Sequence, residues 1–453
     1  HLINGNVTKA GLTLDLEAIQ RAGLSGIQLF HGNIGGRGLW PGVTDPVYCL
    51  SEKWEDHIRY AATECQRLGL TFRMQNCPGW SMSGGPWIKD GEAMRKLAYA
   101  RAFVQGGKLV KKQIKMNGPD LHNVATVAFR VPEGDICPFT HTPGFYSPKG
   151  VSAPGPLEAQ WKELFLKGKG FQLPVAPKGG WTVELDFGGA PLRTMEPPGM
   201  RAWASPRVYH DGVKWTITRV APDGRETQVG SFKNPRATWQ DGGNWSIALP
   251  DDAPYQKLRI TIENEYAINL GKFTFISQAH PDNFEGESGR NLRSLVRRDP
   301  VALKSSAAVQ EVLDLTAQTD AEGNVTWNAP EGNWEIFRIV HVRDNKRNGP
   351  APVEATGWEC DKLSPHGVNA SFAGYIGKLT DPQKGVLKNG LLKGALFDSW
   401  ECVTQNWTPG LDKKFEARYG YKLQPWFPAI IGYVVKDRES TSRFLRDWRV
   451  FLG

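Results

Sequence analysis

The sequence predicts a mixed fold, in which a partial (β/α)8 barrel of the TIM type is interrupted by an antiparallel β-sandwich. Strand and helix patterns alternate in residues 1–106 and again in residues 351–453. Residues 107–350 are instead rich in Gly, Pro and Trp, with short runs in which apolar and polar residues alternate. We therefore expect the two flanking segments to build one α/β domain and residues 107–350 to be an inserted β domain.

The first segment contains helix and strand signals in turn. Thr13 and Ser51 are expected as N-caps, because each precedes a run with helical periodicity and acidic residues in its first turn. Short β-prone runs follow the glycines that end these helices. The elements expected in this segment are helices at 12–23, 51–69 and 90–105 and strands at 26–30 and 70–76.

The middle segment reads as antiparallel β-structure. In the run 181–187, Trp181, Val183, Leu185 and Phe187 face one side and polar residues face the other. The runs 257–264 and 333–342 behave in the same way, and turn signals such as HDG, PDG and PEG separate the strands. A β-sandwich domain accounts for this pattern.

The helix–strand rhythm returns in the last segment. We expect a helix at 364–379, a strand at 394–398, and a helix that Thr408 caps and Gly420 ends. The two flanks together supply about four strands, whereas a closed barrel needs eight. We therefore expect the chain to be truncated at both ends and to come from a longer protein.

Composition excludes several classes of protein. Hydrophobic residues make up 40% of the chain and charged residues 23%, which is typical of a globular protein. No apolar run approaches the ~20 residues that span a bilayer. The net charge of +8 comes from scattered Lys and Arg, which argues against a nucleic-acid partner. The six cysteines form no C-x-x-C pair, so a zinc site has no support.

Acidic, amide and aromatic side chains gather where the expected strands end. In a barrel the carboxyl ends of the strands form the active site, and amides, acids and indole rings together suit a sugar. Asp398 could instead cap a turn, Trp400 and Trp407 could be core residues, and His31 could be structural. The candidates are Asn4, Gln28, His31, Asn76, Trp80, Trp87, Asp398, Trp400, Glu401, Gln405, Asn406 and Trp407.

Four stretches resemble glycoside hydrolase family 106, the α-L-rhamnosidases. They are NGNVTKAGLTLDLEAIQRAGLSGIQLF, NCPGWSMSGGPWI, NGPAPVEATGWECDKLS and FDSWECVTQNWTPGLDKKFEARYGYKLQPWFPAIIG, in the family's order. Cys360 and Cys402 depart from the family's pattern. The resemblance implies a (β/α)8 catalytic domain, release of terminal α-L-rhamnose with inversion, and calcium near the bound sugar.

The resemblance also implies roles for individual residues. Glu401 matches a family glutamate and is expected as the general acid, with Asp398 in a supporting role and the general base outside this chain. The remaining candidates would bind the sugar. A rhamnose-containing oligosaccharide or glycoside of plant or microbial origin is the expected partner, and a periplasmic or secreted location is expected.

Two alternatives stay open. A retaining glycosidase acting on another sugar is one, although Trp400 stands before Glu401 where enzymes of the large retaining clan usually have Asn. A non-catalytic carbohydrate-binding protein is the other, because tryptophan is abundant and a second catalytic acid is not evident.

Overall fold

The computed structural model describes residues 5–31, 42–135, 144–198, 212–235, 245–294 and 298–453. The chain divides into two compact units. The first unit comprises residues 1–97, 118–121 and 341–409, and the second comprises residues 98–117, 122–340 and 410–453. Two strands, β3 (Arg95–Gln105) and β18 (Asn333–Arg343), have residues in both units.

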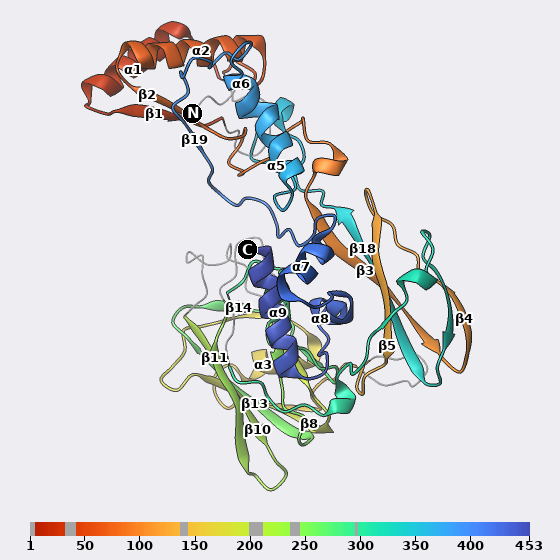
Figure 1. The fold of residues 1–453 in the computed structure, drawn as a ribbon. Coiled ribbons are helices and arrows are strands. Elements are labelled where there is room, and N and C mark those ends of the chain that lie inside the picture. The colour runs from red at the N-terminus through yellow and green to blue at the C-terminus, as the bar shows by residue number, and fades with distance from the viewer. Residues whose placement is uncertain (1–4, 32–41, 136–143, 199–211, 236–244, 295–297) are drawn as a thin grey trace. The chain divides into compact units, whose positions relative to one another are not determined.

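A three-stranded parallel sheet forms the centre of the first unit, in the order β1–β2–β19. The strands are β1 (Gly26–Leu29), β2 (Thr71–Gln75) and β19 (Gly394–Leu396). Helices α1 (Lys9–Arg21) and α2 (Glu52–Arg67) lie along β1 and β2 (Figure 1). The expected strand at 394–398 thus pairs with the expected strand at 70–76. Residues 410–453, expected in the same domain as residues 351–409, belong to the second unit instead.

Helix α2 shows how the sequence fixes this unit. The Ser51 hydroxyl accepts a hydrogen bond from the backbone N–H of Trp54 at 3.1 Å, which confirms the predicted N-cap. Trp54, Ile58 and Cys65 are buried on one face and pack in the core of the unit. The remaining helices among the described residues of the unit are α5 (Pro365–Phe372) and α6 (Lys378–Thr380), which a π-helical turn at Ala373–Gly377 connects, with 3-10 turns at Asp90–Glu92 and Val353–Ala355.

Three helix predictions need correction. The first helix begins at Lys9, four residues before Thr13, and Thr8 is its N-cap because its side chain accepts from the Gly11 N–H at 3.1 Å. The helix expected at 408–420 begins at Leu411 after Gly410. Thr408 does not cap it, because its hydroxyl donates a hydrogen bond to Asp361.

The third error is larger, because residues 90–105 contain no α-helix but a 3-10 turn and β3. Ala, Leu, Lys and Arg in this stretch have high helix propensity. Pairing with β18 overrides that propensity, and Tyr99 of β3 packs on Phe337 of β18 with ring centroids 5.3 Å apart.

The second unit is dominated by antiparallel sheets. A five-stranded sheet has the order β11–β10–β13–β8–β6, and smaller sheets have the orders β12–β9–β15, β14–β7, β16–β5–β18–β3 and β17–β4. The strands are β4 (Lys108–Gln113), β5 (His122–Arg130), β6 (Gly150–Ser152), β7 (Phe171–Leu173), β8 (Trp181–Ala190), β9 (Thr194–Glu196), β10 (Val213–Val220), β11 (Glu226–Lys233), β12 (Ile247–Ala248), β13 (Tyr255–Asn264), β14 (Ile268–Leu270), β15 (Thr274–Ile276), β16 (Leu313–Asp314) and β17 (Asn324–Ala329).

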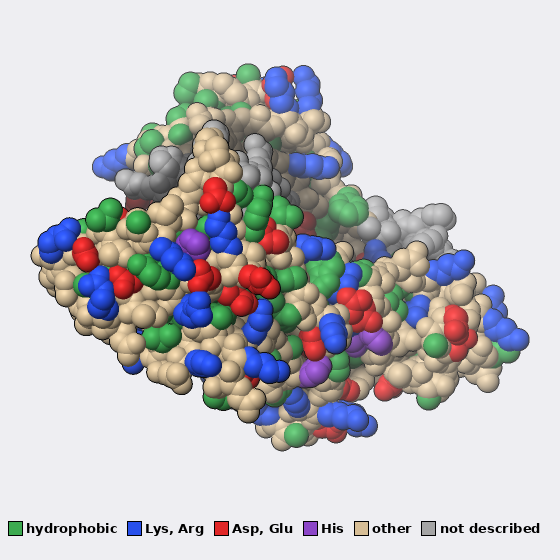
Figure 2. All heavy atoms as spheres, turned by 90° about the horizontal axis from the view of Figure 1, so that it is seen from above, with side chains coloured by type: hydrophobic (Ala, Val, Ile, Leu, Met, Phe, Trp, Pro, Cys, Tyr) green, Lys and Arg blue, Asp and Glu red, His purple; other side chains and the backbone are tan. Residues whose placement is uncertain are grey.

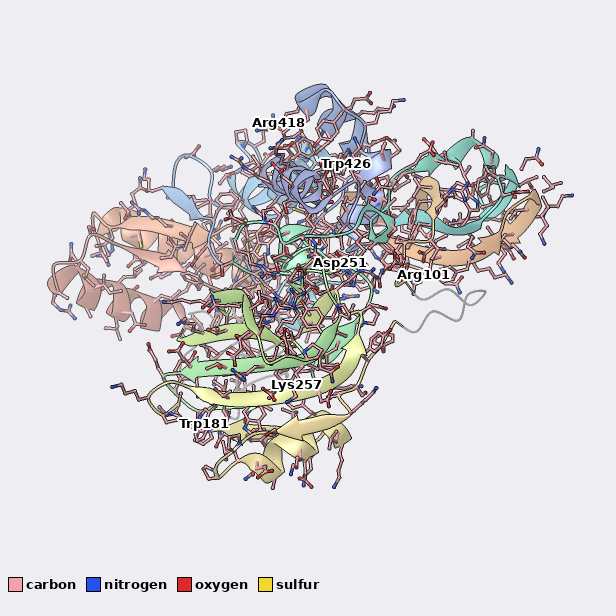
Figure 3. The ribbon with its side chains drawn as sticks, turned by 90° about the horizontal axis from the view of Figure 1, so that it is seen from below. Arg101, Trp181, Asp251, Lys257, Arg418 and Trp426 are labelled. Carbon is pink, nitrogen blue, oxygen red and sulfur yellow. The ribbon has the colours of Figure 1, made fainter. Side chains whose placement is uncertain are left out.

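The largest core of the second unit lies on one face of the five-stranded sheet. Alternate residues of β8, β10 and β13 are buried there together with residues of β7, β9, β12, β14 and β15. The other face of the sheet carries charged side chains. One of them is Lys257 of β13, whose ammonium lies 2.8 Å from the Glu184 carboxylate of β8. Figure 3 labels Lys257 on this sheet and Trp181 at the start of β8.

The helices of the second unit are α3 (Glu158–Lys167), α4 (Phe284–Glu287), α7 (Leu411–Tyr419), α8 (Phe427–Ile430) and α9 (Arg438–Leu452). Phe415 of α7 is fully buried and contacts the rings of Phe444 and Trp448 on α9, which joins the two helices. The Asp437 side chain caps α9 by accepting from the Ser440 N–H at 2.7 Å.

The fold is therefore mixed α/β with several sheets. No sheet of the described residues closes into a barrel, since β1, β2 and β19 form an open parallel sheet. Within the described residues, no helix combines the length and the apolar character that crossing a bilayer requires. Figure 2 shows acidic and basic side chains interspersed on the face seen there, with no patch of a single sign.

Candidate active site

The carboxyl ends of the three parallel strands of the first unit meet at one edge of the sheet. Asn76, directly after β2, donates its backbone N–H to the carbonyl of Leu396 at 3.0 Å. Gly79 donates its N–H to the carbonyl of His31, two residues after β1, at 2.7 Å. Backbone hydrogen bonds thus join the segment after β2 to the end of β19 and to the segment after β1.

A cavity of about 360 Å³ lies beside this edge. Polar groups from three segments face it together with apolar side chains, which is the usual composition of a small-molecule site. Its lining residues are Asn76, Met82, Ser83, Cys360, Lys362, Val368, Asn369, Ser371, Phe372, Ile376 and Phe397.

A buried ion pair supports the wall of the cavity. The ammonium of Lys362 lies 2.8 Å from Oε2 of Glu359, and the Ser83 hydroxyl donates to the same oxygen at 2.8 Å. Glu359 is fully buried and its Oε1 has no hydrogen-bond partner among the described residues. Burial alone would lower the pKa of Lys362, but the neighbouring Glu359 carboxylate raises it above its usual value, so Lys362 stays charged.

Two cysteine thiols lie at or beside the cavity, Cys360 in its wall and Cys402 next to Lys362. Burial raises the pKa of the Cys360 thiol, and it raises the pKa of Cys402 to about 11. A thiol with a raised pKa is largely uncharged near neutral pH and reacts poorly. The site therefore has no thiolate chemistry to offer from these two residues.

Several buried polar atoms near the strand ends have no partner among the described residues. They are Nε2 of Gln28, Oε1 of Gln75, Oδ1 of Asn76 and Oε1 of Glu359. A buried polar atom left unpaired costs about 1–3 kcal/mol, so such atoms are expected where a ligand or water supplies the partner.

The residues after β19 lie against Lys362. Trp400 is 40% exposed, and the Lys362 ammonium lies 5.3 Å from the centroid of its ring. The Cys402 thiol also lies beside Lys362. Glu401, between these two residues, is half-buried, and Asp398 is exposed and accepts a hydrogen bond from the Ser399 N–H at 2.7 Å.

Only Asn76 of the described candidates is among the residues that line the cavity, and Asn4 lies outside the described residues. Gln28 on β1 is half-buried. Trp80 is partly exposed, whereas Trp87 is half-buried and stacks on Tyr375 with ring centroids 5.8 Å apart.

Three other candidates are hydrogen-bonded within the protein or buried in it. Gln405 accepts from the backbone N–H of Lys362 at 3.0 Å and donates to Asp361 Oδ1 at 2.5 Å. Asn406 accepts from the N–H of Leu97 at 2.9 Å. Trp407 is buried. These contacts hold the segment that carries Lys362, so Gln405 is a positioning residue for the cavity wall.

His31 is also tied into the core. The indole N–H of Trp54 donates to His31 Nδ1 at 3.0 Å. Burial lowers the pKa of His31 to about 3, so its ring is neutral at neutral pH. A neutral imidazole of this kind is not suited to act as the general acid.

Glu359 and Lys362 are absent from the candidates chosen by sequence. They belong to the stretch TGWECDKLS, which the sequence marks only through the family resemblance. An acid and a lysine three residues apart usually signal an exposed surface pair, and only the structure shows that this pair is buried.

Metal ligation can be judged only within the described residues. There, no three His, Cys, Asp or Glu side chains come together in an arrangement that could hold a metal ion. The calcium implied by the family resemblance stays a prediction, and no described side chains are assigned to it.

Comparison with known proteins identifies relatives of the chain. The sequence model of the family described as alpha-L-rhamnosidase matches residues 1–453. A protein of Formosa agariphila named “Putative beta-glucuronidase” is 28% identical over 455 residues, which cover 100% of this chain and 27% of that protein. The structure of a rhamnosidase from Novosphingobium sp. PP1Y aligns with a TM-score of 0.68 and 24% identity, over 100% of this chain and 43% of that one. The chain thus spans less than half the length of either relative.

Proposed function

Because the chain belongs to the alpha-L-rhamnosidase family of glycoside hydrolases, we propose that it is part of an enzyme that releases terminal α-L-rhamnose from a glycan or glycoside. The cavity beside the carboxyl ends of β1, β2 and β19 is the observation that carries this proposal. It combines an exposed tryptophan nearby, a charged lysine and the unpaired amide oxygen of Asn76, and these groups suit a sugar.

The proposed mechanism is an inverting hydrolysis with Glu401 as the general acid. Glu401 would protonate the glycosidic oxygen as the bond to the anomeric carbon breaks, while a second carboxylate outside this chain activates the attacking water. Its place between Trp400 and Cys402, which both lie beside Lys362, supports a role at this edge. Asn76 would hold a sugar hydroxyl through its unpaired amide oxygen.

The general acid is tested in the full-length enzyme by Glu401→Gln, which keeps the size and hydrogen bonding of the side chain but cannot deliver a proton. General acid catalysis contributes about 10²–10⁴-fold in rate, so kcat on an alkyl rhamnoside should fall by that order. An aryl rhamnoside with an acidic phenol needs little protonation, so its hydrolysis should fall much less.

Asp398→Asn is the control, because Asp398 is exposed on the same strand end and is proposed only as a support. It should show no dependence on the leaving group. Equal losses on both substrates in Glu401→Gln would remove Glu401 as the acid. A fall in kcat for Asp398→Asn that depends on the leaving group would assign the role of general acid to Asp398.

A retaining glycosidase that acts on an acidic sugar is the second candidate. The name of the Formosa agariphila relative is the observation that favours an acidic sugar. Turnover of an aryl rhamnoside against an aryl glucuronide separates the two substrates, and NMR of the first-formed anomer separates inversion from retention. Sugar binding with no turnover of either would indicate a non-catalytic protein.

The full barrel, the inserted sandwich and a periplasmic or secreted location belong to the same proposal. The parallel sheet of β1, β2 and β19, with helices preceding β1 and β2, is consistent with part of a (β/α) barrel. A structure of the full-length protein in which further parallel strands continue this sheet would support that interpretation.

A further inference from the structure

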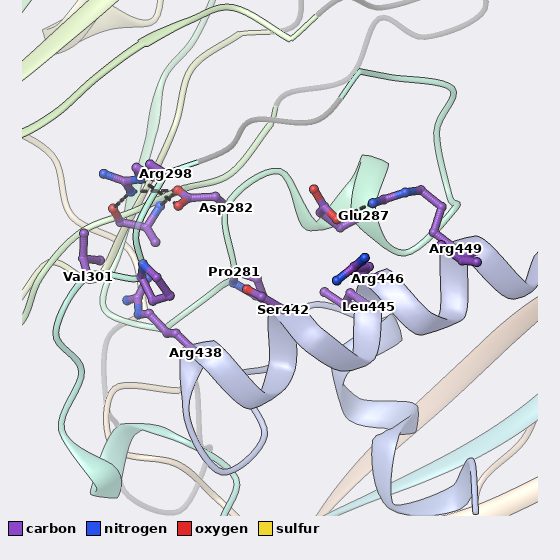
Figure 4. A pocket seen from close by; sticks show the side chains of 13 residues that line it. Pro281, Asp282, Glu287, Arg298, Val301, Arg438, Ser442, Leu445, Arg446 and Arg449 are labelled. Carbon is purple, nitrogen blue, oxygen red and sulfur yellow. Dashed lines mark hydrogen bonds and ion pairs between the residues drawn. The ribbon is translucent and has the colours of Figure 1, made fainter. Parts of the chain in front are cut away.

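A second cavity, of about 580 Å³, lies entirely within the second unit and is rich in arginine (Figure 4). Four arginines and two carboxylates line it, together with proline, valine and leucine side chains. Its lining residues are Ala248, Pro281, Asp282, Glu287, Arg298, Pro300, Val301, Arg438, Ser442, Leu445, Arg446, Arg449 and Val450.

Both carboxylates of this cavity are already neutralised. Asp282 receives two hydrogen bonds from Arg298, each at 2.7 Å. Glu287 is paired with Arg449. The other two arginines, Arg438 and Arg446, form no ion pair with any described residue, so the cavity has an excess of positive charge.

Arg438 is buried and forms no direct ion pair with a described residue, although the nearby carboxylates of Asp282 and Asp251 attract it. Its side chain is 5% exposed, and its guanidinium donates only to the backbone carbonyls of His280, Arg193 and Leu249, at 3.3, 3.4 and 3.1 Å. Its Nε has no partner among the described residues. Asp251 and Asp282 are already paired with Arg193 and Arg298, so they compensate the buried charge of Arg438 only in part, and an anion in the cavity would compensate it further.

Arg446 supplies an accessible cation on the same helix. Arg438, Ser442, Arg446 and Arg449 are spaced for one face of α9, and Figure 4 shows them on the side that faces Asp282 and Glu287. Arg446 is exposed and has no hydrogen bond or ion pair with the described residues. Eight residues of helix separate Arg438 from Arg446, which places their Cα atoms about 12 Å apart.

We propose that this cavity binds an acidic saccharide through its carboxylates, with Arg438 and Arg446 as the receiving cations. The spacing of the two cations favours a chain with repeated charges over a single small ion, and the apolar residues of the wall can pack against sugar C–H groups. The saccharide nature of the ligand rests on the proposed function, whereas the anion site itself rests on the arginines alone.

The experiment measures binding by calorimetry, with tetragalacturonate as the acidic probe and its methyl ester as the neutral counterpart. Inorganic sulfate alone is the third probe. The variants are Arg446→Gln and, as the matched control, Arg443→Gln, which removes an exposed α9 arginine that pairs with Glu439 and does not line the cavity. Neither change removes a buried contact, so both proteins should fold.

We expect tetragalacturonate to bind and its methyl ester not to bind. A hydrogen bond between charged groups is worth about 1.5–3 kcal/mol, so Arg446→Gln should weaken the affinity by about 10–100-fold. Arg443→Gln should leave the affinity unchanged. Equal binding of the acidic and neutral probes, or equal effects of the two variants, would overturn the site. Sulfate binding as tightly as tetragalacturonate, with the same loss in Arg446→Gln, would overturn its assignment to a saccharide.

Hydrolysis of an aryl rhamnoside by the full-length enzyme separates this inference from the proposed function. Its rate should be the same with Arg446→Gln as with the unaltered enzyme. Absence of hydrolysis together with the expected binding pattern would refute the proposed function and leave the anion site standing.

Discussion

Replacing Lys362 by methionine should leave the Glu359 carboxylate buried in the first unit without its ion-pair partner. Glu359 is fully buried, and the hydrogen bond that Ser83 donates to it at 2.8 Å would remain. Removing one member of a buried ion pair costs about 3–5 kcal/mol, because the other charge stays buried without compensation. We expect about 3 kcal/mol, the lower end, because Ser83 still donates to the carboxylate.

The double variant Glu359→Gln/Lys362→Met tests the cause of this loss. It removes both charges, and the amide oxygen introduced at position 359 can still accept from Ser83, so its cost should be clearly smaller than that of Lys362→Met alone. The interaction free energy from the double-mutant cycle should then be about 2–3 kcal/mol. Urea unfolding, followed by tryptophan fluorescence, measures the free energies.

Lys378→Met is the matched control for this prediction. Lys378 lies 2.8 Å from Glu55, the same distance as in the buried pair, but its side chain is 59% exposed. Exposed pairs contribute about 0–1 kcal/mol, so this variant should be nearly as stable as the unaltered chain. Equal losses in Lys362→Met and Lys378→Met, or additive costs in the double variant, would refute the reasoning.

Two further predictions concern stability in each unit. In the second unit, burial and then the Asp135 carboxylate raise the pKa of Glu335 above its ordinary value of 4.5, so the folded chain holds a proton that the unfolded chain releases. The free energy of unfolding should therefore fall as the pH rises from about 4.5 towards the alkaline range, and Glu335→Gln should flatten this dependence in thermal melts between about pH 5 and 9. In the first unit, Ser51→Ala removes the cap of α2 and should cost about 1 kcal/mol in urea unfolding. Thr63→Ala, exposed on the same helix, should cost nothing by comparison.

The elements that sequence predicted well are those with a local cause. The Ser51 cap, the glycine stops and the alternation in β8 and β13 depend on residues within a few positions, and the structure contains them. The stretch 90–105 was predicted wrongly because its helix propensity is local whereas its partner, β18, lies more than 200 residues further along the chain.

Thr408 illustrates the same limit at a cap. Its sequence context, Thr-Pro-Gly before a periodic run, favours an N-cap, yet its hydroxyl donates to Asp361 Oδ2 at 2.6 Å and α7 begins after Gly410. Gly410 has φ of 77°, a left-handed conformation that glycine adopts without strain. The hydrogen bond from Thr408 to Asp361 thus accompanies a helix start two residues later than predicted. A contact between residues so far apart in the chain cannot be predicted from the local sequence.

The candidate site divides according to whether each amide still has an open hydrogen-bonding group. Both ends of the Gln405 amide are used by Asp361 and Lys362, so a sugar would have to break existing bonds to engage it. The amide nitrogen of Asn76 donates a hydrogen bond to the Met82 carbonyl. The amide oxygen of Asn76 is buried beside the cavity and has no partner among the described residues. Sequence places both residues at strand ends and cannot tell them apart. Since an unpaired buried oxygen costs about 1–3 kcal/mol and a paired one costs little, Asn76 gains more from a ligand in this cavity than Gln405 does.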